Sequence, residues 1–277
     1  MGENGPGRHE PVIDELAEVW ASIVEACRLV EDEQWNRATD CPGWSVKDNL
    51  SHLIGIERML LGDPSPPALT EVPDYVRNPF GELNEAWVEA RRHVPGAEVL
   101  AEFMDATNRR IDALMAMSTD EFDVVGWSPV GDVPYRDFMA TRVLDTWAHE
   151  QDMRRALGRA GGRNGAGEQV VLDRCAETMP YVVGKVVAPP DGTSVLFVVT
   201  GAMGRQVLVA VHQRRASPSP GPPAVPPTVT LTMDQEVFWR RCYGRLGPDE
   251  SATDGPVAIE GDLDLGRRVL AGMAFMI

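Results

Sequence analysis

The chain lacks cysteine pairs and long apolar segments, and each absence argues against a class of protein. Its four cysteines are far apart and form no CxxC pair, so we expect neither a disulfide framework nor an all-cysteine zinc site. Every apolar stretch is short and interrupted, which argues against a membrane-spanning helix. Residues 1–10 are polar and contain no apolar core of the kind that signal peptides have. We therefore expect a cytoplasmic protein.

Positive charge is also scarce. The formal net charge of −16 argues against binding to nucleic acid or to an anionic membrane surface. The acidic excess is uneven, because residues 1–160 carry 15 basic and 30 acidic side chains and residues 161–277 carry 11 and 12. A chain of 277 residues is long enough for two domains, and this break in charge predicts one domain over 1–160 and a second over 161–277.

The first of these predicted domains has the periodicity of a helix bundle. Ser45 followed by Asp48 is typical of the start of a helix, and Gly158 is typical of an end. Helices joined by short connections form bundles, and facing helices of a bundle often hold metal sites in its core. Apolar residues recur at three- and four-residue steps in the segments 11–30, 48–61, 84–92, 97–117 and 135–157.

The second predicted domain mixes strands and helices, which indicates a small α+β fold. Runs of β-branched residues predict strands, and a stretch rich in proline at 217–227 predicts a loop. We expect strands at 194–200, 206–212, 228–232 and 256–260, and helices at 168–187, 234–243 and 264–276.

Two histidines and an aspartate in the predicted bundle are candidate metal ligands. Asp145 and His149 are four residues apart, so a helix places them on one face, one turn apart. A carboxylate and an imidazole so placed can bind one metal ion, and His52 is a candidate third ligand. Three protein ligands leave a position open for water, a thiolate or a substrate oxygen, as in catalytic sites. A structural hydrogen bond between aspartate and histidine explains the same spacing, so both interpretations stay open at this point.

Asp152 lies a further turn along the same predicted helix. We expect it to orient His149 by accepting a hydrogen bond, as metal-binding histidines usually require; a direct ligand or an ion pair with Arg155 are the alternatives. Cys41 is a candidate nucleophile, although an incidental thiol is the favoured interpretation.

The segments around these ligands resemble one known family. Residues 35–53 contain Thr39-Asp-Cys-Pro-Gly-Trp44 and His52, and they are similar to the first metal motif of DinB-like metalloenzymes in the branch of the mycothiol-dependent maleylpyruvate isomerases. Residues 145–152 resemble the second motif, carboxylate-x-x-x-His-x-x-Asp. Residues 228–277 resemble the sterol-carrier-like C-terminal domain of that branch. The resemblance implies an N-terminal DinB-like four-helix bundle with a metal site and a small C-terminal α+β domain.

The resemblance also implies a cofactor and a reaction class. A divalent metal ion, with zinc as the expected one, is held by His52, Asp145 and His149, and mycothiol is the cosubstrate. A metal ion lowers the pKa of a thiol, so the thiolate adds to a small electrophile; an isomerase then releases the thiol, whereas an S-transferase keeps the adduct. The isomerases have glutamate where this chain has Asp145.

Further residues are candidates for binding and catalysis. We expect mycothiol and a small electrophile as the only partners, and a monomer or weak homodimer. Two other functions stay open: thiol-independent zinc hydrolysis with Asp152 or Glu150 as base, and a non-catalytic, metal-stabilised ligand-binding protein. For each arginine below, a structural salt bridge is the alternative role. The binding candidates are Arg77, Asn78, Trp127 and Arg142, and the catalytic candidates are Arg245 and Asp152.

Overall fold

The computed structural model describes residues 9–129, 131–219, 221, 225–247 and 257–276. The chain forms two compact units, Met1–Glu168 and Gln169–Ile277. Residues 1–8, on which the expectation of no signal peptide largely rests, lie outside the described residues. The domain boundary expected at 160/161 stays a prediction. No helix in the described part of the chain is long and apolar enough to cross a membrane.

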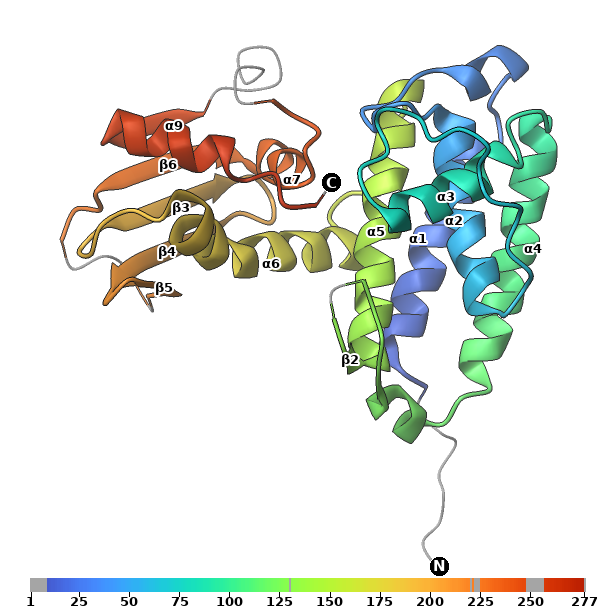
Figure 1. Ribbon diagram of the computed structural model, residues 1–277, viewed down its shortest axis with the longest axis horizontal. Helices are drawn as coiled ribbons and strands as arrows, with labels where there is room; N and C mark the ends of the chain where they lie inside the picture. The colour runs from blue at the N-terminus through green and yellow to red at the C-terminus, as the bar shows by residue number, and fades with distance from the viewer. Residues whose placement is uncertain (1–8, 130, 220, 222–224, 248–256, 277) are drawn as a thin grey trace, which may run out of the picture. The chain divides into compact units, whose positions relative to one another are not determined.

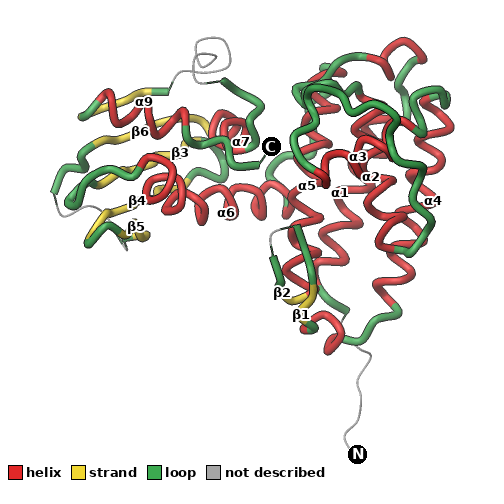
Figure 2. Tube along the Cα trace, viewed as in Figure 1, coloured by secondary structure: helices red, strands yellow, loops and turns green. Residues whose placement is uncertain are grey.

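The first unit is a four-helix bundle, as expected (Figures 1 and 2). A shorter helix, α3 (Pro79–Glu89), packs against α2. Apolar side chains such as Leu16, Leu50 and Phe103 are fully buried in the bundle core, and burial of each such side chain stabilises the fold by roughly 1.5–3 kcal/mol. The bundle helices are α1 (Pro11–Cys27), α2 (Val46–Leu60), α4 (Gly96–Met115) and α5 (Tyr135–Leu157).

Local sequence signals set the ends of the helices that matter for the site. The Ser45 side chain accepts from the Asp48 backbone N–H, and the Asp48 carboxylate accepts from the Ser45 N–H, so the predicted start of α2 is confirmed. Helix α5 ends at Gly158, whose φ of 65° suits glycine. Helix α3 begins at Pro79, five residues before the segment expected over 84–92, and the Asn78 side chain caps it by accepting from the Gly81 N–H.

Short elements connect these helices. They are the 3-10 turns η1 (Asp32–Asn36) and η2 (Thr119–Asp123), and the paired two-residue strands β1 (Val125–Gly126) and β2 (Val133–Pro134).

The second unit is an α+β fold around a five-stranded sheet of order β5-β4-β3-β6-β7. Neighbouring strands are antiparallel except for β3 and β6, which are parallel. Alternate residues of β3 and β6 are buried. Helix α7 (Gln235–Cys242) contacts both strands, and α9 (Leu263–Ala271) contacts β6. The strands are β3 (Ser194–Thr200), β4 (Arg205–His212), β5 (Arg215–Pro218), β6 (Val229–Asp234) and β7 (Ala258–Gly261).

Three expectations for this unit need correction. The proline-rich segment 217–227 was expected to be a loop, but its first two residues form the end of β5, which pairs with β4. Residues 220 and 222–224 of this segment lie outside the described residues. Pro256, the first residue of the expected fourth strand, also lies outside them. The helix expected to run to Val187 is α-helical only to Tyr181 and continues as a π-helix, η3. The last helix ends at Ala271, five residues before Met276. The helical segments are α6 (Ala166–Tyr181), η3 (Val182–Val187), α7 (Gln235–Cys242) and α9 (Leu263–Ala271).

Candidate metal centre

Helices α2 and α5 bring His52, Asp145 and His149 together. One potential ligand atom from each lies within 4.8 Å of those of the other two. Nε2 of His52 is 3.3 Å from Oδ2 of Asp145, and Nε2 of His149 is 3.7 Å from Oδ1 of the same carboxylate. The two imidazole rings meet edge to face, with their centroids 4.7 Å apart. Two histidine nitrogens therefore converge on the two oxygens of one carboxylate.

The protonation states at this cluster favour metal ligation. Burial lowers the pKa of His52 to about 4, although the neighbouring Asp145 opposes this, so His52 is neutral at pH 7. Burial alone would raise the pKa of Asp145, but the Arg142 guanidinium and the two histidines outweigh burial and hold that pKa well below its usual range. The cluster thus offers a neutral imidazole and an ionised carboxylate at neutral pH, which are the forms that bind metal ions.

A buried arginine fixes the Asp145 carboxylate. Nη1 of Arg142 donates to Oδ2 of Asp145 (2.6 Å), while its Nε and Nη2 donate to Oε1 of Glu57 (3.0 and 2.8 Å). On the other side of Glu57, Nε of Arg110 lies 3.3 Å from Oε2, and Arg110 also contacts the Tyr135 hydroxyl. Arg142 was expected to bind the cosubstrate; the structure places its guanidinium between two carboxylates, and a binding role stays a prediction.

His149 has a hydrogen-bond partner on the facing helix that its sequence spacing does not indicate. Nδ1 of His149 lies 2.6 Å from Oδ1 of Asn49 and 3.6 Å from Oδ2 of the expected partner, Asp152. Asp152 is fully buried beside the ring, but Asn49 makes the shorter contact. Asn49 lies one turn before His52 on α2, and no local pattern in the sequence links it to His149 on α5.

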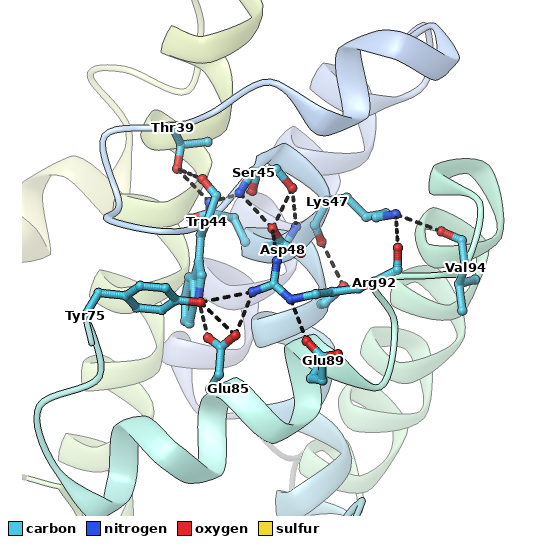
Figure 3. A network of polar contacts seen from close by, with 12 residues as sticks. Thr39, Trp44, Ser45, Lys47, Asp48, Tyr75, Glu85, Glu89, Arg92 and Val94 are labelled. Carbon is cyan, nitrogen blue, oxygen red and sulfur yellow. Dashed lines mark hydrogen bonds and ion pairs between the residues drawn. The ribbon is translucent and has the colours of Figure 1, made fainter. Parts of the chain in front are cut away.

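Trp44 forms one wall of the cluster. Its ring centroid lies 5.0 Å from that of His52 and 5.7 Å from that of His149. Figure 3 shows how the indole is held: Nε1 donates to Glu85 (2.8 Å), whose carboxylate also accepts from Tyr75 (2.9 Å) and Arg92 (2.6 Å).

Arg92 extends the same network to the start of α2, where its Nη1 donates to Oδ2 of Asp48 (3.2 Å). Asp48 pairs with Ser45 in the capping box of this helix, so the network ties the loop carrying Trp44 to both α2 and α3.

The other predicted residues are exposed or contact groups outside the cluster. Arg77 is exposed, and Asn78 caps α3. Trp127 is 63% exposed, with its ring 6.3 Å from that of Phe80. Glu150, a candidate base for hydrolysis, accepts hydrogen bonds from Ser22 (2.5 Å) and Arg154 (2.6 Å). Arg245 belongs to the second unit, where Nη1 donates to the Tyr243 carbonyl (3.0 Å); its catalytic role stays a prediction.

The cluster fits a divalent ion by the chemistry of its donors. Two imidazoles and one carboxylate are a ligand set that catalytic zinc sites use. The imidazoles are almost fully buried, whereas the Asp145 side chain is 27% exposed, so solvent reaches the cluster on the side of the carboxylate. A second potential metal-binding group, Cys41, His149 and Asp152, shares His149 with the first.

Comparisons with known proteins identify relatives of both units. Residues 16–154 match the family model of the mycothiol maleylpyruvate isomerase N-terminal domain, and residues 169–268 match that of the MDMPI C-terminal domain. Two uncharacterized proteins of Mycobacterium tuberculosis, from strains CDC 1551 / Oshkosh and ATCC 25618 / H37Rv, are each 28% identical over 134 residues. That match covers 46% of this chain and 48% of each relative, about half the length of either.

Two solved structures share the fold over almost the whole chain. The crystal structure of the mycothiol-dependent maleylpyruvate isomerase has a TM-score of 0.56 at 14% identity, covering 90% of this chain and 91% of that one. A mutant of the same isomerase, with a histidine replaced by alanine, has a TM-score of 0.54 with the same identity and coverage.

Proposed function

The chain belongs to the mycothiol maleylpyruvate isomerase family, and we propose that it is a metal-dependent enzyme that uses mycothiol as the nucleophile on a small electrophile. The observation that carries the proposal is the convergence of His52 and His149 on the carboxylate of Asp145, with Nε2–oxygen distances of 3.3 and 3.7 Å. In this proposal these three residues hold one divalent ion, zinc being the expected one. A bound zinc ion would lower the pKa of a thiol so that the thiolate forms at neutral pH.

The charges around the cluster favour an anionic ligand. Asp145 is the one charged group of the proposed ligand set, and Arg142 already neutralises it through a 2.6 Å hydrogen bond. The second carboxylate nearby, Glu57, lies between Arg142 and Arg110. A divalent ion bound here would therefore keep most of its positive charge uncompensated by the protein. A thiolate supplies the missing negative charge better than neutral water does.

The surrounding residues prepare the site for this chemistry. Arg142 orients the carboxylate, and Trp44 covers one side of both imidazoles and shields the rings from water. The exposed side of Asp145 is the proposed entrance for the thiol. Isomerisation and S-transfer both begin with addition of the thiolate to the electrophile. They differ in whether the thiol then leaves the adduct, and analysis of the products distinguishes them.

The test is the thiol dependence of turnover. Zinc-loaded protein is mixed with maleylpyruvate, or with another small electrophile, in the presence of mycothiol, of glutathione or of no thiol. We expect turnover with mycothiol alone, and its loss in His149→Ala but not in Arg109→Ala, which changes an exposed arginine of α4. Turnover without a thiol would replace the proposal with zinc hydrolysis. Zinc binding and stabilisation with no turnover of any electrophile would replace it with the ligand-binding protein.

A further inference from the structure

We propose that Asn49 is a positioning residue that fixes the tautomer of His149 and thereby decides which of two potential metal-binding groups this histidine serves. The inference rests on the proposed metal-binding role of His149, but it concerns a property of the metal-free protein. The Nδ1–Oδ1 contact of 2.6 Å joins residues 100 positions apart on α2 and α5.

The hydrogen bonds of Asn49 determine which end of its amide faces His149. Nδ2 of Asn49 donates to the Ser45 carbonyl oxygen (2.9 Å) and to Oγ1 of Thr39 (2.9 Å). A carbonyl oxygen can only accept a hydrogen bond, and the Thr39 hydroxyl donates its own hydrogen to the Trp44 carbonyl (2.9 Å). Both partners thus require a donor, and only the nitrogen end of the amide can supply one. The oxygen end must therefore face His149.

The orientation of the amide fixes the proton on the imidazole. Because Oδ1 of Asn49 can only accept, Nδ1 of His149 must carry the hydrogen that lies between them. In the neutral ring Nε2 is then unprotonated, with its lone pair available for a metal ion. Asn49 is fully buried, so water does not compete for this contact.

This tautomer distinguishes between the two groups that share His149. Nε2 is the nitrogen near Asp145, at 3.7 Å, whereas Nδ1 is the nitrogen near Asp152, at 3.6 Å. A protonated Nδ1 cannot ligate an ion held with Cys41 and Asp152. Asn49 therefore assigns His149 to the group with His52 and Asp145. Cys41 and Asp152 then have no histidine ligand to share a metal ion with them.

Thr39 gives this arrangement its rigidity. Its hydroxyl accepts from Asn49 and from the backbone N–H of Cys41 (3.2 Å) while it donates to Trp44. The loop 39–44 is thus joined through one side chain to the amide that orients His149. Nδ1 of His52, by contrast, is buried without a hydrogen-bond partner among the described residues, so this support is specific to His149.

The test measures the tautomer directly. Long-range ¹H–¹⁵N correlation spectra of the metal-free protein at pH 8.5 report which imidazole nitrogen carries the hydrogen, and His149→Gln assigns the signals. We expect His149 to be protonated at Nδ1 in the wild type and to populate both tautomers in Asn49→Leu. Zinc affinity, measured by competition with a chelator, should fall about 10–100-fold in Asn49→Leu. Ser51→Ala removes another buried hydrogen bond of α2 and should change neither readout.

Two results would overturn the inference. One is an Nε2-protonated His149 in the metal-free wild type; the other is an Asn49→Leu protein with wild-type tautomer and zinc affinity. If Asn49→Leu does not fold, Thr39→Val, which removes one anchor of the amide, takes its place with the same expected direction. The tautomer is read without metal, thiol or substrate, so a failed turnover experiment leaves this result intact.

Discussion

Replacement of Arg142 by methionine tests the charge balance on which the site depends. The guanidinium is buried, donates twice to Glu57 and once to Asp145, and its loss leaves Glu57 with Arg110 alone. Removing one partner of a buried ion pair costs about 3–5 kcal/mol, because the other charge stays buried. Glu57 is fully buried and Asp145 is 27% exposed, so we assign the larger share of this loss to Glu57.

The assay is urea unfolding of Arg142→Met with EDTA and with saturating zinc. Without metal, we expect the free energy of unfolding to fall by about 3–5 kcal/mol. Zinc should recover only the smaller share, because an ion at Asp145 replaces the missing positive charge there but not at Glu57. Arg109→Met is the matched control: it removes an exposed arginine that pairs with Asp63, and we expect no measurable change. An unfolding midpoint of Arg142→Met equal to that of the wild type in EDTA would show that the buried carboxylates do not depend on Arg142.

Three further predictions concern acid stability, the loop 39–44 and the second unit. The pKa of His52 is about 4 in the folded protein and about 6.5 in the unfolded chain, so the unfolded state binds more protons between these values. The free energy of unfolding of the metal-free protein should therefore fall by about 3 kcal/mol as the pH falls from 6.5 to 4. Urea unfolding at each pH should show this loss in the wild type and not in His52→Gln. Gly43→Ala places a methyl group against the Tyr75 ring at a φ of +79°; it should lower the free energy of unfolding by more than about 1 kcal/mol, whereas Gly62→Ala, with the same φ and open space, should cost less. Arg245→Gln should keep the full zinc content and reduce mycothiol-dependent turnover, as measured by metal analysis and initial rates; full turnover would exclude a catalytic role for Arg245.

Local signals in the sequence predicted much of the fold. The limits of α5 follow from apolar periodicity and from Gly158, and the start of α2 follows from the Ser45–Asp48 pair; both are confirmed. Strand β5 was missed because its proline and serine residues are typical of loops, and its pairing with β4 decides its structure. The change from α-helix to π-helix after Tyr181 is not visible in the apolar periodicity, although Pro180 inside α6 is a residue type that interrupts helices.

The site was predictable as a set of ligands but not as a network. Helical spacing and the family motifs indicated His52, Asp145 and His149, and the structure brings them together. Asn49 and Glu57 were missed because their partners are 100 and 85 residues away in the sequence. A lone amide or carboxylate on a helix face gives no sign of such a partner. Asp152 was the expected acceptor for His149 because it lies on the same helix, whereas the shorter contact comes from the facing one.

The zinc X-ray absorption spectrum before and after addition of mycothiol tests most directly whether the cluster holds zinc and whether that zinc binds the thiol. Without the thiol, we predict a first shell of nitrogen and oxygen only, at about 2.0–2.2 Å, from two histidines, one aspartate and solvent. With mycothiol, one sulfur should appear at about 2.3 Å, and His149→Ala should abolish zinc binding. A sulfur neighbour already present without the thiol, and lost in Cys41→Ser, would place the ion in the other group. A spectrum that mycothiol leaves unchanged would contradict the proposed role of the thiol.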